Sequence, residues 1–257
     1  MVFDPVLAWS SLPQLLRGAA MTIMVTVPIL ILGGCVAVPI ALARLSDKRP
    51  ARAFAVGYVV IFRGTPSLIL LYLVYSGLGN IEAVRASPLW PVLSKAYPCA
   101  VIGFVLVHSA YVVEILRGAL EAVPRGLIEA GQALGLSPRT MLWQVRLPVA
   151  LRYALRSYQN EVLILIKSTA AVSAITVVDL MAVANEIFYI TYDPFTPFIA
   201  AGGLYWLLIN AVRFGFDTAD RHFNAHLAVA HTGSVRTRRN FASFAGFGTV
   251  KPSEATR

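Results

Sequence analysis

Residues 18–43 read GAAMTIMVTVPILILGGCVAVPIALA and contain no charged side chain. As an α-helix, a run of this length reaches about 39 Å, more than the roughly 30 Å of hydrocarbon in a bilayer. The run is too long for the apolar region of a cleaved signal peptide, and the preceding segment, with Asp4 and Arg17, lacks the basic start of such peptides. We therefore predict that residues 18–43 cross a membrane.

The composition of the whole chain agrees with a membrane protein. Of its 257 residues, 57% are apolar and 14% are charged, whereas about 25% of a soluble domain is charged. This balance excludes a disordered chain and argues against a soluble enzyme. The net charge of +9 would suggest nucleic-acid binding in a soluble protein. Cytoplasmic loops of membrane proteins also collect Lys and Arg, so we expect lipid rather than nucleic acid around this chain.

Further apolar runs predict four more spans, at about 53–79, 98–117, 157–178 and 194–216. We thus expect an all-α integral membrane fold with five transmembrane helices in residues 1–221. Residues 222–257 are polar, basic and rich in Ala, Ser, Thr and Gly. This composition predicts a disordered cytoplasmic tail.

The basic residues alternate between connections. They gather after the first span, after the third span and in the tail. The charged residues in the connection from the fourth to the fifth span are all acidic, namely Asp179, Glu186 and Asp193. Because cytoplasmic loops are enriched in Lys and Arg, we expect the N-terminus outside and the C-terminus inside.

The loop at 123–150 contains two short helical segments. The first covers Leu127 to Leu134, and Gly135 then suits the left-handed backbone that ends many helices. Ser137 resembles an N-cap with Pro138 in the first helical position, and we expect Pro148 to close this second segment.

Met141, Leu142 and Val145 fall on one face of the second segment at helical spacing. Such a face can dock into a groove on a partner protein. It can equally pack against the chain's own spans, and the residues alone do not separate these two alternatives.

The loop resembles the cytoplasmic loop of membrane subunits of ATP-binding-cassette (ABC) importers. That loop has the form E-A-A, three residues, G, nine residues, I-x-L-P. Every spacing fits, with Gly131 in place of the third-position Ala and Val145 in place of Ile. The matching residues are Glu129, Ala130, Gly131, Gly135, Val145, Leu147 and Pro148.

Other phrases are typical of the branch that carries histidine, arginine and opines. They are Phe62-Arg63-Gly64-Thr65-Pro66, then Ala110-Tyr111 with Glu114, Arg117 and Gly118, then Asn160-Glu161 and Pro194-Phe195-Thr196. The resemblance implies a multi-pass permease of a bacterial inner membrane. It also implies a cytoplasmic ATPase dimer seated on the loop, a second permease chain and a periplasmic solute-binding protein.

Charged residues within the predicted spans need an explanation, because they are costly in hydrocarbon. In one interpretation they form structural pairs, such as Lys167 with Glu114. In the other, Arg63 or Lys167 contacts the carboxylate of a solute, an acid such as Glu114 or Glu161 contacts its amino group, and Thr65, Ser168 and Thr169 add hydrogen bonds.

Other classes of protein fit less well. No lysine follows a glycine, so the chain has no phosphate-binding loop and is not itself the ATPase. It has no H-E-x-x-H or G-x-S-x-G motif, so we predict no catalytic activity, cofactor or metal. His108 stands alone, as expected of a packed or cavity-facing histidine. A passive channel or a non-ABC transporter subunit is the alternative function.

Overall fold

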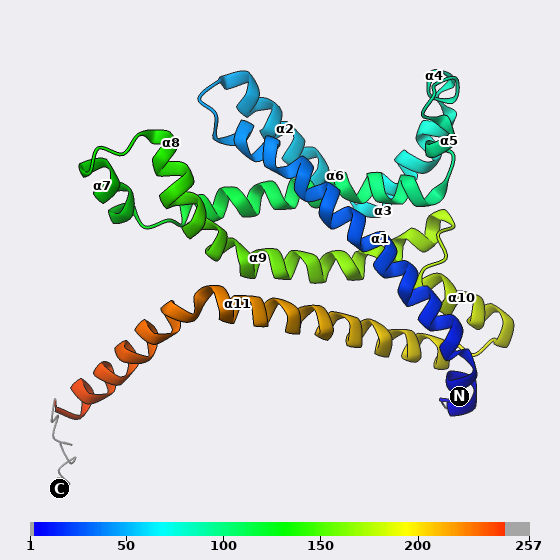
Figure 1. Ribbon diagram of the computed structural model, residues 1–257. Helices are drawn as coiled ribbons and strands as arrows, with labels where there is room; N and C mark the ends of the chain where they lie inside the picture. The colour runs from blue at the N-terminus through cyan, green and yellow to red at the C-terminus, as the bar shows by residue number, and fades with distance from the viewer. Residues whose placement is uncertain (1–2, 245–257) are drawn as a thin grey trace, which may run out of the picture. The chain divides into compact units, whose positions relative to one another are not determined.

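A computed structural model describes the backbone of residues 3–244 and the side chains of residues 3–220. The described backbone is mostly helical, with short connections between the helices, and contains no strand (Figure 1). Its elements are α1 (Pro5–Leu45), α2 (Arg49–Gly64), α3 (Ser67–Tyr72), η1 (Leu73–Gly77), η2 (Leu78–Asn80), α4 (Glu82–Arg85), α5 (Trp90–Leu93), α6 (Ala96–Glu121), α7 (Arg125–Ala133), α8 (Pro138–Thr140), η3 (Met141–Arg146), α9 (Leu147–Ser168), η4 (Thr169–Ile175), α10 (Leu180–Thr191) and α11 (Thr196–Phe244).

The chain divides into two compact units, residues 1–216 and residues 217–257. The second unit includes the segment expected to be a disordered tail. The backbone of this segment continues α11 and is helical through Phe244. Residues 245–257 lie outside the described residues.

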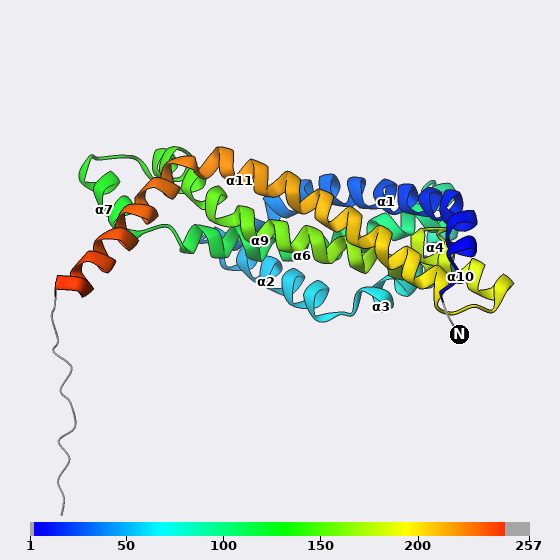
Figure 2. The same ribbon diagram turned by 90° about the horizontal axis from the view of Figure 1, so that it is seen from below.

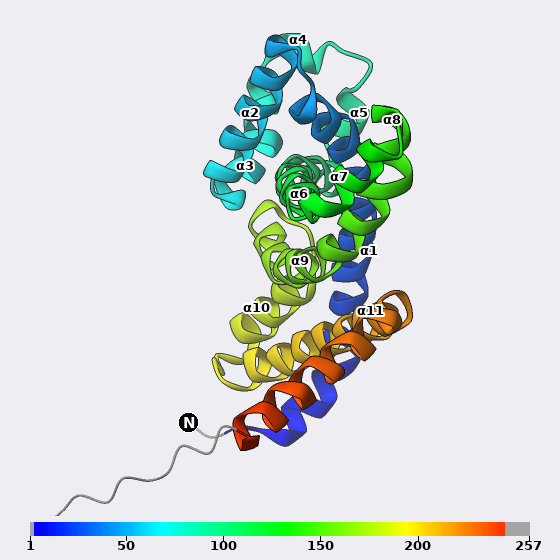
Figure 3. The same cartoon turned by 90° about the vertical axis from the view of Figure 1, so that its left-hand side faces the viewer.

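Helix α6 is the centre of the first unit. Figure 3 views it nearly end-on, with α1, α2, α3 and α9 around it. Phe104 of α6 is 1% exposed and packs in a cluster with Val25 and Ile29 of α1, Leu71 of α3 and Leu165 of α9. Burial stabilises the packing of α6 against its neighbours by about 1.5–3 kcal/mol for each large apolar side chain.

Helix α1 begins well before the predicted span. Pro5 occupies the first turn, where its missing N–H costs nothing. The carboxylate of Asp4 accepts hydrogen bonds from the backbone N–H groups of Val6 and Leu7 at 2.8 and 3.2 Å. This cap satisfies donors that a helix start leaves free, so the helix starts at Pro5 and continues through residue 18.

Three helices are long and apolar enough to cross a membrane: Pro5–Leu45, Ala96–Glu121 and Thr196–Asp220. Two further candidates are bent pairs, Arg49–Gly64 with Ser67–Asn80 (102°) and Pro138–Ile175 with Leu180–Thr191 (52°). The bend between α2 and α3 is visible in Figure 2. The structure therefore supports three to five spans.

Helix α10 lies in the connection between the fourth and fifth predicted spans, for which no element was predicted. Asp179 is fully buried and caps it, accepting from the backbone N–H of Ala182 at 2.9 Å and from the Tyr205 hydroxyl at 3.2 Å. The start of α10 packs closely against α1, because a Cβ atom at Gly18 would lie 2.8 Å from the Leu180 Cα atom.

This contact predicts that Gly18→Ala destabilises the protein. The new methyl group meets backbone atoms, which cannot turn away as a flexible side chain can, and overpacking of this kind costs about 1–3 kcal/mol. Gly34→Ala is the matched control, because a Cβ atom there has nothing within 4 Å. Thermal unfolding in detergent should show a lower Tm for Gly18→Ala only. Equal Tm values for the two variants would contradict the close contact.

Candidate functional site

The loop after α6 contains the predicted helix pair. Helix α7 ends at Ala133, and Gly135 has φ +73°, which confirms the predicted left-handed helix end. The N–H of Leu136 donates to the Gly131 carbonyl at 3.1 Å, and the N–H of Gly135 donates to the Gln132 carbonyl at 2.9 Å. Both are the bonds of a Schellman motif.

The predicted start of the second segment is confirmed as well. Pro138 occupies the first turn, and the Ser137 side chain accepts from the Thr140 N–H at 3.2 Å.

The predicted end of the second segment at Pro148 is wrong. The chain passes through a π-helical segment, η3, directly into α9, so the helix continues to Ser168. Leu147 donates its N–H to the carbonyl of Leu142, five residues back. The wider turn ends beside Pro148, which has no N–H to donate, and thereby admits the proline without breaking the helix.

The apolar face of the second segment packs mainly against the chain itself. Met141 is 6% exposed and fills the space beside Gly131, where a Cβ atom would collide with the Met141 methyl group. Leu142 packs on a cluster that includes Leu120 of α6 and Ala150 of α9. Gly131 thus makes room for Met141, and Val145 and Leu147 are half-buried.

A different set of loop residues faces outward. Leu134 is 80% exposed, Trp143 is 54% exposed, and Leu127 is exposed as well. Glu129 and Ala130 of the E-A-A motif are also exposed, as are Gly135 and Pro148. The outward apolar set was not predicted, although the seven-residue spacing of Leu127 and Leu134 was a signal for it.

A cavity of about 300 Å³ opens between α2, α3, α6 and α9. Four predicted solute-contact residues line it: Arg63, Thr65, Glu161 and Ser168. The Arg63 guanidinium lies 4.9 Å from the centre of the Tyr111 ring, a cation–π contact that orients the charge. The volume of the cavity is at the lower end of the range for small-molecule sites.

Glu161 is 8% exposed and is held by His108, whose Nδ1 atom lies 3.2 Å from Glu161 Oε1. The His108 ring is fully buried and packs on α1, where a Cβ atom at Gly33 would lie 2.7 Å from His108 Cδ2. His108 is both packed and cavity-lining, as the sequence suggested. The carboxylate is therefore fixed at the cavity wall.

The other predicted solute-contact residues lie elsewhere. Lys167 lines a separate hollow of about 510 Å³ beside Trp206 and Arg213 of α11. Thr169 is fully buried and donates its hydroxyl to the Ile166 carbonyl at 2.7 Å. Glu114 does not line either hollow.

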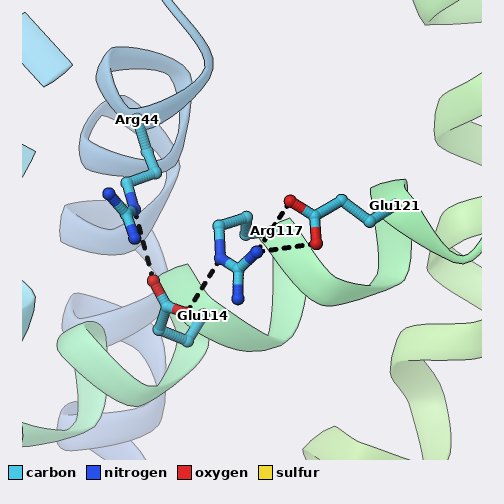
Figure 4. A network of polar contacts seen from close by, with 4 residues as sticks. All are labelled: Arg44, Glu114, Arg117 and Glu121. Carbon is cyan, nitrogen blue, oxygen red and sulfur yellow. Dashed lines mark hydrogen bonds and ion pairs between the residues drawn. The ribbon is translucent and has the colours of Figure 1, made fainter. Parts of the chain in front are cut away.

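Glu114 belongs to an ionic network, which Figure 4 shows from close by. It pairs with Arg44 and Arg117, and Arg117 also pairs with Glu121. The suggested pair of Lys167 with Glu114 is therefore wrong, because Glu114 is taken by the two arginines. Among residues 3–220 the structure gives Lys167 no ion pair.

Comparison with known families decides the class. Residues 29–224 match the family described as the binding-protein-dependent transport system inner membrane component. The chain belongs to this family. It is therefore a multi-pass inner membrane protein and a transport permease subunit of the ABC importer type, as the resemblance implied.

Curated relatives within the family cover most of the chain. The nopaline transport system permease protein NocM of Agrobacterium fabrum is 36% identical over 226 residues, which is 88% of this chain and 94% of NocM. The octopine transport system permease protein OccM of Rhizobium meliloti is 37% identical. The match covers 80% of this chain and 84% of OccM. The histidine/lysine/arginine/ornithine transport system permease protein HisM of Salmonella typhimurium is 36% identical. The match covers 82% of this chain and 90% of HisM.

Solved structures agree on the fold. A chain of an amino acid ABC transporter, crystallised with histidines, superposes with a TM-score of 0.78 at 28% identity. The match covers 86% of this permease and all of that chain. A chain of the methionine ABC transporter MetNI, in an inward-facing conformation, gives a TM-score of 0.61 at 22% identity. The match covers 86% of this permease and 99% of that chain.

Proposed function

We propose that this permease forms the translocation path for polar or cationic amino acids, or opine-like derivatives, in an ATP-driven importer. The relatives support the solute class, since their names give nopaline, octopine and the basic amino acids as cargo. Such solutes carry a carboxylate and an amino or guanidino group.

The observation that carries the proposal is the pair of opposite charges in one cavity. Arg63 and Glu161 line the same space, together with the hydroxyl-bearing residues Thr65 and Ser168. In this proposal, Arg63 binds the solute's carboxylate and Glu161 binds its cationic group. Charge-assisted hydrogen bonds of this kind are about twice as strong as neutral ones. Lys167, in the separate hollow, is the alternative partner for the carboxylate.

A cytoplasmic ATPase supplies the energy in this proposal. It docks on the exposed loop surface, which we define as Leu127, Glu129, Ala130, Leu134 and Trp143. Two permease chains, identical or related, and two ATPase chains form the complex, and a periplasmic binding protein delivers the solute. ATP hydrolysis then takes place on the separate ATPase chains, since this sequence has no phosphate-binding loop.

The proposed topology has five spans, with each bent pair counted as one span. The N-terminus is outside and the C-terminus inside. The support is the distribution of charge: Arg and Lys follow α1 and flank the loop of α7, whereas Asp179, Glu186 and Asp193 lie around α10 with no basic residue between them.

Affinity purification of the tagged chain in mild detergent, followed by mass spectrometry, tests the proposed function. We expect an ATP-binding subunit and either a second permease or a second copy of this chain. A chain that purifies without any ATPase would contradict the proposal and favour a passive channel or a non-ABC transporter subunit.

A further inference from the structure

Two arginines and two glutamates alternate along one ionic network at the end of α6 (Figure 4). Glu114 Oε1 lies 3.3 Å from Arg44 Nε, and Glu114 Oε2 lies 2.9 Å from Arg117 Nε. The Arg117 Nη1 atom then lies 2.6 Å from Glu121 Oε2. The four charges cancel, so the network needs no further counter-ion to be stable near the membrane.

The network occupies the place where α1 ends against α6. One turn earlier, Ala37 and Ala41 of α1 pack in an apolar cluster with Val112 and Val113 of α6. Ala43 and Leu116 pack against this cluster, so the apolar contact reaches the residue before Arg44, the last basic residue of α1. The ion pair of Arg44 with Glu114 therefore continues the contact between the two helices to the end of α1.

The same end of α6 also contacts the loop. Ala119, Leu120 and Val123 form a cluster with Ala150 and Ala154 of α9, and Ile128 and Leu142 of the loop pack against this cluster. After Glu114, helix α6 is thus attached to the loop by apolar packing, and at Glu114 the carboxylate adds an ion pair to the apolar contact with α1.

The two glutamates differ in what their loss would do. The Glu114 side chain is 15% exposed and separates two guanidinium groups, so its neutralisation leaves Arg44 without this anion and facing Arg117, which keeps Glu121. The Glu121 side chain is 62% exposed and contacts Arg117 alone. An exposed pair of this kind contributes little.

We propose that Glu114 is a positioning residue that joins the end of α1 to the loop end of α6, so that ATP-driven movement of the loop is transmitted to α1. The inference rests on the proposed function, because it requires an ATPase on the loop. Loss of Glu114 then leaves ATP hydrolysis intact and makes it less productive.

The test compares Glu114→Gln with Glu121→Gln, the same change on the same helix at the other partner of Arg117. Each full chain is purified with its native ATPase and binding protein and reconstituted in proteoliposomes. Uptake of labelled arginine, octopine and nopaline and hydrolysis of ATP are measured on the same vesicles. We expect Glu114→Gln to raise the ATP hydrolysed per solute by about fivefold or more, the scale of coupling between distant sites. Glu121→Gln should keep the wild-type ratio.

Arg44→Gln keeps the proposal testable if Glu114→Gln does not assemble. It leaves Glu114 paired with Arg117 but removes the ion pair to the end of α1, so the ratio of ATP to solute should again rise. An unchanged ratio in either assembled variant, Glu114→Gln or Arg44→Gln, would overturn the role of Glu114. If the wild-type complex showed no ATP-dependent uptake of any of the three solutes, the proposed function itself would fail instead.

Discussion

Replacing Gly135 with valine should abolish recovery of the ATPase with the permease. Gly135 has φ +73° and ends α7, with Leu136 donating to the Gly131 carbonyl across it. The left-handed backbone costs about 1–2 kcal/mol for a residue with a Cβ atom, and the cost is higher for a β-branched residue. We expect the turn to open and to displace Leu134 from the other residues of the exposed loop surface.

Gly135→Asn is the matched control for this experiment. Asparagine is similar in volume to valine but tolerates the left-handed backbone, and nothing lies within 4 Å of a Cβ atom at this position. We expect Gly135→Asn to retain the ATPase and Gly135→Val to lose most of it in purification from detergent. Retention of the ATPase by both variants would show that the geometry of this turn does not position the docking surface.

Replacing Arg63 with alanine should reduce solute uptake by about tenfold or more. The Arg63 side chain lines the cavity that also contains Glu161, and it stacks on Tyr111. A hydrogen bond to a charged group contributes about 1.5–3 kcal/mol, and each 1.4 kcal/mol is a factor of ten in affinity. The measurement is the concentration dependence of uptake of labelled arginine, octopine and nopaline.

Two variants make the result specific. Arg63→Lys keeps the positive charge and should recover part of the uptake. Lys167→Ala removes a cation that lines the separate hollow and should have the smaller effect. If Lys167→Ala stopped uptake while Arg63→Ala left it unchanged, the solute's carboxylate would have to be assigned to the hollow of Lys167.

The long elements of the fold are predictable from the sequence because hydrophobic length sets them. Residues 18–43 and 98–117 fall within α1 and α6. Helix α10 was missed, although Asp179 is a recognisable cap, because its segment is short and follows an apolar run that was assigned to the preceding span. The early start of α1 was missed for a similar reason, since Asp4 and Pro5 precede the uncharged run by more than three turns.

The loop shows where local chemistry suffices and where it does not. The backbone at Gly135 and the cap at Ser137 depend on neighbouring residues alone, and both were predicted correctly. The continuation of the helix past Pro148 depends on the π-helical segment η3, for which the sequence has no clear signal.

Partners across the fold were the least predictable feature. Glu114 and Lys167 carry opposite charges within the predicted spans, yet Glu114 pairs with Arg44 and Arg117. The meeting of Arg63 and Glu161 in one cavity depends on how α2 and α9 pack around α6. Hydrophobic periodicity indicates that helices pack, but it does not indicate which polar side chains meet.

The most direct test of the central claim is solute uptake by the reconstituted complex with and without ATP. Proteoliposomes that contain the purified complex receive labelled arginine, octopine or nopaline together with the binding protein. We predict uptake against a concentration gradient that requires both ATP and the binding protein. Uptake that proceeds without ATP and stops at equal concentrations on both sides would contradict the account and establish a passive pathway.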